Sequence, residues 1–187
     1  MVYAGTIVKG QAHENTKILG QAFDAFSMSI KGEEIAPTFE EVKKKYGYDD
    51  IDPEGWYPLQ MSFDTYAAMK KRSGDSLILV SMGTEVINAA KLPDEITTIE
   101  QSIRLLMDIH HLNLKDLPEG DGYTNLKVKD KKITFEDHTT FPHDVIYGYI
   151  YGMAQRFRPE KTRPIVEREY LNKDEPDYGG AKYTITW

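Results

Sequence analysis

The feature that most constrains the fold is a change of hydrophobic period near residue 118. Before it, apolar residues recur at helical spacing, most clearly from Ile99 to Leu114. After it, residues 126–128 and 133–135 alternate like the strands of a hairpin, and residues 181–187 alternate again. Helices that come first and strands that come mostly last predict an α+β fold, in which a helical N-terminal part packs against a C-terminal antiparallel sheet.

Capping residues and apolar stripes also place the individual elements. We expect helices over 15–29, from Pro37, over 64–71, from Asp75, from a Thr97-x-x-Glu100 capping box and from Pro142 to Phe157. We expect a last hairpin from Pro164 to the C-terminus, around a turn at 177–180.

Length and charge narrow the class of protein. The 187 residues suit one domain, 1–187, and the absence of cysteine excludes disulfides and Cys-type metal sites. A formal charge of −7 argues against binding to nucleic acid or to anionic lipid. No apolar run approaches the roughly 18 residues of a membrane span. Because the N-terminus has no secretory signal pattern, the cytoplasm is the expected location.

The common enzyme signatures are missing from the sequence. We find no phosphate-binding glycine loop, no His-Glu-x-x-His, no Gly-x-Ser-x-Gly and no EF-hand loop. Since no nucleophile and base can be paired, we expect a binding protein and not an enzyme.

Four of the five histidines lie close together in the chain: His110, His111, His138 and His143. Histidine is the usual ligand for a metal or haem iron where cysteine is absent, although a buried histidine is more often hydrogen-bonded within the core. The predicted helix turns His110 and His111 roughly toward the core. Adjacent helical residues point about 100° apart, so at most one of the pair binds an ion.

Tyrosines and glycines alternate in the predicted helix after Pro142. Tyr147, Tyr149 and Tyr151, with Gly148 and Gly152, could line a flat pocket for a planar ligand. The alternative is ordinary packing, in which a neighbouring helix approaches the bare backbone of the two glycines.

A resemblance to a known family rests on the segment from Met107 to Leu114. Its Asp-Ile-His-His-Leu-Asn-Leu resembles the proximal-helix motif Asp-x-x-His-Leu-x-Leu of the H-NOX (haem nitric oxide/oxygen binding) family. Residues 144–152, Phe157 and 183–187 look like the C-terminal helix and strands of that family. The resemblance implies an H-NOX-like fold and haem ligation by His111.

One family motif is replaced. The Tyr-x-Ser-x-Arg that holds the porphyrin propionates should fall at 136–140, where this chain has Glu136, His138 and Thr140 in those three places. An arginine pairs with a carboxylate as threonine cannot, and Glu136 would repel a propionate. Either haem is held differently, with His138 or His143 contributing, or the fold is kept without haem.

The second outcome has parallels among relatives of this fold. Vinyl-reductase-like domains and the transport-particle subunits of vesicle tethering are similar to it and serve as small-molecule binders or scaffolds. The leading hypothesis is nevertheless a haem-binding sensor of nitric oxide, oxygen or carbon monoxide that signals to a separate protein. The alternative is a haem-free module that binds a small apolar molecule or a protein, with a homodimer packed through Gly148 and Gly152.

The candidate residues follow from these patterns. Cofactor contacts are expected from His111, Met107, Leu114, Tyr147, Gly148 and Tyr151. Candidate metal ligands are His111 first, with His110, His138 and His143 as alternatives.

Overall fold

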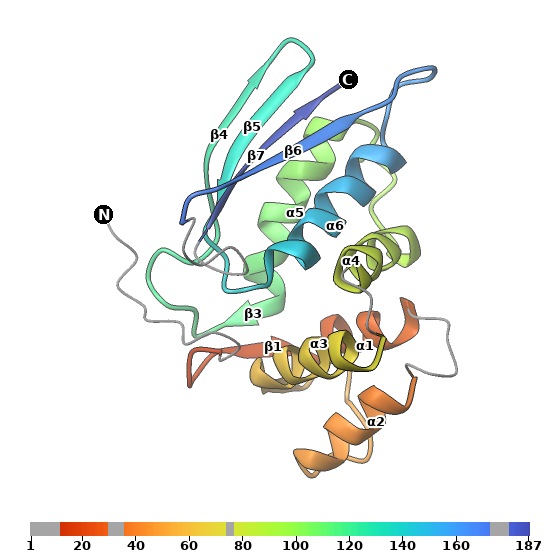
Figure 1. Ribbon diagram of the computed structural model, residues 1–187, viewed down its shortest axis with the longest axis vertical. Coiled ribbons are helices and arrows are strands. Elements are labelled where there is room, and N and C mark those ends of the chain that lie inside the picture. Colours follow the sequence, from red (N-terminus) through yellow and green to blue (C-terminus); the bar gives the residue numbers. More distant parts are fainter. Residues whose placement is uncertain (1–11, 30–35, 74–76, 173–179) are drawn as a thin grey trace.

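Two helices cover one face of a four-stranded antiparallel sheet, and a mainly helical half adjoins them (Figure 1). The structure is a computed structural model that describes residues 12–29, 36–73, 77–172 and 180–187. The helices are α1 (Gly20–Ser29), α2 (Ala36–Lys45), α3 (Gln60–Ser73), α4 (Ile78–Ala89), α5 (Ile99–Asn113) and α6 (His143–Arg156). The strands are β1 (Lys17–Leu19), β2 (Trp56–Pro58), β3 (Leu114–Lys115), β4 (Tyr123–Lys129), β5 (Lys132–Asp137), β6 (Ile165–Tyr170) and β7 (Ala181–Thr186).

The larger sheet confirms the expected C-terminal part of the α+β fold. Its strand order is β4-β5-β7-β6, with every neighbouring pair antiparallel. Residues of β5 and β7 alternate between buried and more exposed, so one face of the sheet packs on the core and the other faces outward. The expected turn at 177–180 lies outside the described residues except for Gly180.

Helix α5 begins one residue later than the sequence pattern indicates. The capping box uses Thr98 and Gln101, whose side chains bond each other's backbone N–H groups, and not Thr97 and Glu100. Both patterns satisfy the open N–H groups of the first turn, and the local sequence does not separate them. The buried stripe of the helix is Ile99, Ser102, Ile103, Leu106 and His110.

The start of the chain corrects another expectation. Residues 17–19 form β1 and not the first turn of a helix, because the strand lies between β2 and β3 in a second, three-stranded sheet. Buried Ile18 pairs with Tyr57 on one side and Leu114 on the other. Contacts distant in sequence thus override the local helical pattern.

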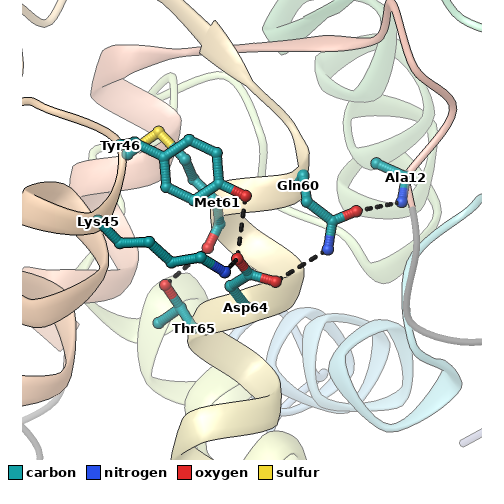
Figure 2. A network of polar contacts seen from close by, with 7 residues as sticks. All are labelled: Ala12, Lys45, Tyr46, Gln60, Met61, Asp64 and Thr65. Atoms are coloured by element: carbon teal, nitrogen blue, oxygen red, sulfur yellow. Dashed lines mark hydrogen bonds and ion pairs between the residues drawn. The ribbon is translucent and has the colours of Figure 1, made fainter.

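Asp64 links three segments in the mainly helical half (Figure 2). Its carboxylate accepts hydrogen bonds from Lys45 Nζ (2.5 Å), Tyr46 Oη (2.9 Å) and Gln60 Nε2 (2.9 Å). Gln60 Oε1 in turn accepts the backbone N–H of Ala12 at 2.7 Å. Burial raises the pKa of Asp64, but these hydrogen bonds outweigh it and the net pKa is lowered.

The closest helix contact lies between α4 and α6, at two glycines. A Cβ added to Gly148 would lie 2.3 Å from the carbonyl oxygen of Val80 and 2.9 Å from Cα of Gly83. Thr84 Oγ1 donates to the carbonyl of Gly148 across the same contact (3.3 Å). Gly148 and Gly152 therefore mark a crossing of two helices within the chain. Helix α4 covers the face of α6 that the sequence analysis considered for a dimer.

Within the described ranges, no helix combines the length and apolar character needed to cross a bilayer.

The helix crossing predicts an unusual sensitivity at Gly148. Gly148→Ala should lower the free energy of unfolding by at least about 2 kcal/mol, because backbone atoms of α4 must move away from the new methyl group. That loss would come despite a helix-propensity gain of about 1 kcal/mol. Urea denaturation measures it, with Ser81→Ala on the exposed side of α4 as a control expected to stay within about 0.5 kcal/mol. A Gly148→Ala protein as stable as the original would contradict the close crossing.

The Asp64 network predicts a pH-dependent difference in stability. Asp64→Asn should cost about 1 kcal/mol at pH 7, a modest value because Lys45 is largely exposed. A carboxylate with a lowered folded pKa stabilises above its unfolded pKa and loses that effect as pH falls through the folded value. The difference between the two proteins should therefore shrink below about pH 4. Urea denaturation at several pH values tests this, with exposed Asp50→Asn as the control; a constant difference would contradict it.

Candidate functional site

His110 is the histidine that α5 carries into the interior. Its side chain is 5% exposed and its Nε2 lies 2.5 Å from Oδ1 of buried Asp121, in the turn before β4. The rings of Tyr123 and Phe141 stand edge-on to the imidazole, at 5.6 and 6.1 Å between centroids. His110 is thus hydrogen-bonded and enclosed by aromatic rings.

A second buried pair lies where β5 passes into α6. His143 Nδ1 is 3.6 Å from Oδ2 of Asp137, and neither side chain is more than 1% exposed. Tyr170 lies against the imidazole with ring centroids 5.5 Å apart. Tyr183 Oη donates to the carbonyl of His143 at 3.2 Å, and burial followed by the charge of Asp137 raises the pKa of Tyr183 well above 10. Tyr183 therefore acts as a neutral donor.

The segment 137–143 joins the two pairs. The backbone N–H of Thr140 donates to Asp121 Oδ2, and that of Thr139 donates to Asp137 Oδ1, each at 2.9 Å. Two consecutive amides therefore hold the carboxylates that face α5 and α6. The same segment also holds buried polar atoms without a hydrogen-bond partner among the described residues, namely Asp137 Oδ2, Thr139 Oγ1, Thr140 Oγ1 and both ring nitrogens of His143.

His111 points away from this interior. It is exposed, as are Asp108 one turn before it and the Arg104 that pairs with Glu100. Its imidazole lies over Gly122, where an added Cβ would be 3.2 Å from the His111 Cε1 and Nε2 atoms. The expectation that both histidines face the core is correct for His110 alone, because one residue of a helix turns the side chain by about 100°.

The other predicted contact residues do not gather around His111. Met107 is half-buried on α5, and Leu114 is buried at the start of β3 beside Ile18. Tyr147 donates its hydroxyl to the carbonyl of Val166 at 3.2 Å. The structure thus distributes these residues between two regions of the core.

Tyr147 and Tyr151 stack on each other along α6, with centroids 6.3 Å apart and planes 8° from parallel. The Arg168 guanidinium lies 5.2 Å from the Tyr147 ring and pairs with Asp144 at 2.9 Å. Gly148, which lies between the two tyrosines in sequence, faces α4 instead. The tyrosines and the glycine therefore do not share one flat pocket.

The three positions expected to hold propionates interact within the chain. Glu136 accepts a hydrogen bond from Asn125 (2.9 Å) and lies 3.4 Å from Nε2 of His138. The hydrogen bond from Asn125, opposed by desolvation and aided by His138, lowers the pKa of Glu136, so its negative charge persists. Thr140 is buried beside Asp121. In the part of the chain that the structure describes, no group of three or more acidic or histidine side chains could hold a metal ion.

Sequence reasoning did not identify Asp121 or Asp137 as partners of the histidines. Asp121 stands in a Pro- and Gly-rich turn, and Asp137 ends a strand, positions where aspartate is ordinary. No local spacing reveals either pairing, because each depends on how a strand returns beside a helix.

The sequence has no significant match to a protein-family model or to a curated protein. Solved structures do match. An H-NOX protein from S. oneidensis in the Fe(II) state has a TM-score of 0.66 at 11% identity, covering 90% of this chain and 95% of that one. An oxygen-binding H-NOX domain related to soluble guanylate cyclases has a TM-score of 0.64 at 16% identity, covering 89% and 93%. The chain has an H-NOX-like fold.

At such low identity the likeness establishes the H-NOX-like fold alone, so the fit of haem depends on the residues present. They do not fit the mode that the family resemblance implies. His111 points outward, while the Nε2 of inward-facing His110 is held by Asp121. Helix α4 fills the space over Gly148, and Glu136 puts a negative charge where a propionate would need a positive one.

The two neighbouring histidines should respond differently to substitution. His110→Ala should cost about 3–5 kcal/mol of unfolding free energy, because it leaves the Asp121 carboxylate buried without its partner. His111→Ala should stay within about 0.5 kcal/mol, since its side chain is exposed. Urea denaturation of both variants measures the contrast, and equal losses would contradict the placement of His110 inside.

Proposed function

We propose that this chain is a haem-free protein-interaction module with an H-NOX-like fold. The observation that carries the proposal is the 2.5 Å contact between His110 and Asp121, which occupies the only histidine that α5 directs inward among the described residues. A nitrogen hydrogen-bonded to a buried carboxylate is not free to bind iron. Breaking the pair would leave that carboxylate uncompensated.

The close packing of the interior supports an interaction role over the binding of a large planar cofactor. Gly83 and Gly148 bring α4 and α6 into backbone contact. Phe141 packs edge-on to Phe63, with centroids 6.0 Å apart, and also contacts the His110 ring. A porphyrin at either place would have to displace a packed helix or an aromatic cluster.

A haem-dependent gas sensor is the second candidate. It is favoured by the Met107–Leu114 motif and by neighbours of this fold that bind haem or oxygen. In that case His111 would be the haem ligand. The signal would be nitric oxide, oxygen or carbon monoxide, and a separate protein would receive it. Met107, Leu114, Tyr147, Gly148 and Tyr151 remain predicted contacts for that candidate, with His110, His138 and His143 as alternative ligands.

Both candidates are non-enzymatic. The haem-free module would bind another protein, and the gas sensor would signal to one. The cytoplasm remains the predicted location. A small apolar ligand remains compatible with the haem-free module.

Hemin titration separates the two candidates. We expect the purified chain, expressed with a haem precursor, to show no saturable hemin uptake and no sharp Soret band in ferric, ferrous or CO-bound form. The packed interior, and Glu136 and Thr140 in the places of the tyrosine and arginine of the propionate motif, are the physical reasons.

Two variants make the titration decisive. A stoichiometric Soret band that His111→Ala abolishes and His110→Ala leaves unchanged would overturn the haem-free proposal in favour of the sensor. Weak absorption that is equal in both variants indicates non-specific hemin adsorption and agrees with our proposal.

A further inference from the structure

The outward face of the four-stranded sheet is mainly polar, apart from exposed Ile165 at the start of β6, and carries charged side chains on all four strands. Figure 1 shows the helices on the opposite side of this sheet. Strand register places its outward side chains in rows that cross all four strands. One row, from β4 to β6, is Lys127, Thr134, Thr184 and Glu167. The next is Thr124, Glu136, Lys182 and Glu169.

Opposite charges occupy two pairs of mirror positions in these rows, whereas Thr124 mirrors Glu169 and the neighbouring row of Lys129, Lys132, Thr186 and Ile165 holds no acidic side chain. Lys127 on outer strand β4 mirrors Glu167 on outer strand β6, and Glu136 on β5 mirrors Lys182 on β7. Thr134 and Thr184 mirror each other at the centre. Among the described residues, neither Lys127 nor Glu167 forms an ion pair, and both are exposed.

This pattern suits a second copy of the same chain. A two-fold axis parallel to the strands, between β5 and β7, would stack each row on its own mirror image. Lys127 would then meet Glu167 of the second copy, Glu136 would meet Lys182, and threonine would meet threonine. A two-fold axis across the strands would instead stack Lys127 on Lys127 and Glu167 on Glu167, which is repulsive.

We propose that two copies of this chain associate through the outward faces of their β4-β5-β7-β6 sheets, about a two-fold axis parallel to the strands. The surface deepens the proposed interaction role by naming one partner, and it replaces the Gly148 face that α4 covers. Aligned packing of two twisted sheets is a common arrangement.

The area of this sheet face limits the expected affinity of the dimer. Four strands of about six residues present roughly 400 Å², well below the roughly 800 Å² per partner of a stable interface. We therefore expect a weak dimer with a Kd of roughly 10 µM to 1 mM. Exposed charge pairs contribute more to orientation than to affinity, and salt should weaken the dimer.

Charge reversal and rescue test the proposal on the full chain. Sedimentation velocity up to roughly 1 mM should show the mean mass rising from the 21.4 kDa of the monomer toward twice that value. Lys127→Glu and Glu167→Lys should each raise the Kd at least about tenfold, and the double variant should return to within about threefold of the original. Lys71→Glu, the same charge change on exposed α3, should leave the Kd within about threefold.

Three outcomes would reject the surface: a monomer at every concentration, a dimer unaffected by Lys127→Glu, or a double variant no better than the single ones. Circular dichroism should confirm that the variants fold, as expected for exposed positions. A monomeric chain that takes up no hemin would reject this dimer and leave the haem-free module standing, so the two proposals fail separately.

Discussion

The C-terminal half of the structure depends on how two buried carboxylates are compensated. Asp121 and Asp137 have no exposed side-chain surface, and a carboxylate removed from water is costly unless it is paired and hydrogen-bonded. Each accepts one backbone N–H from the same short segment, and Asp121 is also hydrogen-bonded to His110, whereas Asp137 lies 3.6 Å from His143, beyond hydrogen-bond distance. The end of α5, the start of α6 and the sheet are therefore held in a single arrangement around 137–143.

Under the haem-free proposal, this pairing also explains how an H-NOX-like fold can persist without the chemistry of the family. Hydrogen bonds within the chain connect α5 to the sheet through His110 and Asp121. The two glycines let α4 pack directly on α6, and the residues in place of the propionate motif bond to one another. The fold and the cofactor are separable because the packing that specifies the fold needs no iron.

Strong periodic patterns made much of the fold predictable. The apolar stripe on α5 keeps the helical period, and the alternation in β5 and β7 keeps the strand period. Each pattern continues over enough residues to identify the element and its buried face. The glycines at 148 and 152 indicated a close approach. Short elements were missed: the three residues of β1 read as helix, because three residues carry too little pattern to outweigh the stripe beside them.

The sequence by itself determined that most helices precede a C-terminal antiparallel sheet and that histidines lie near the end of α5, because these follow from local period and residue type. Only the tertiary structure decided which histidine turns inward, that Asp121 and Asp137 receive the two buried imidazoles, and that α4 covers Gly148. It also decided which charges share the outward face of the sheet. Those features depend on contacts between residues distant in the chain. The choice between His110 and His111 depends on a shift of one residue along the helix, which leaves the hydrophobic pattern almost unchanged.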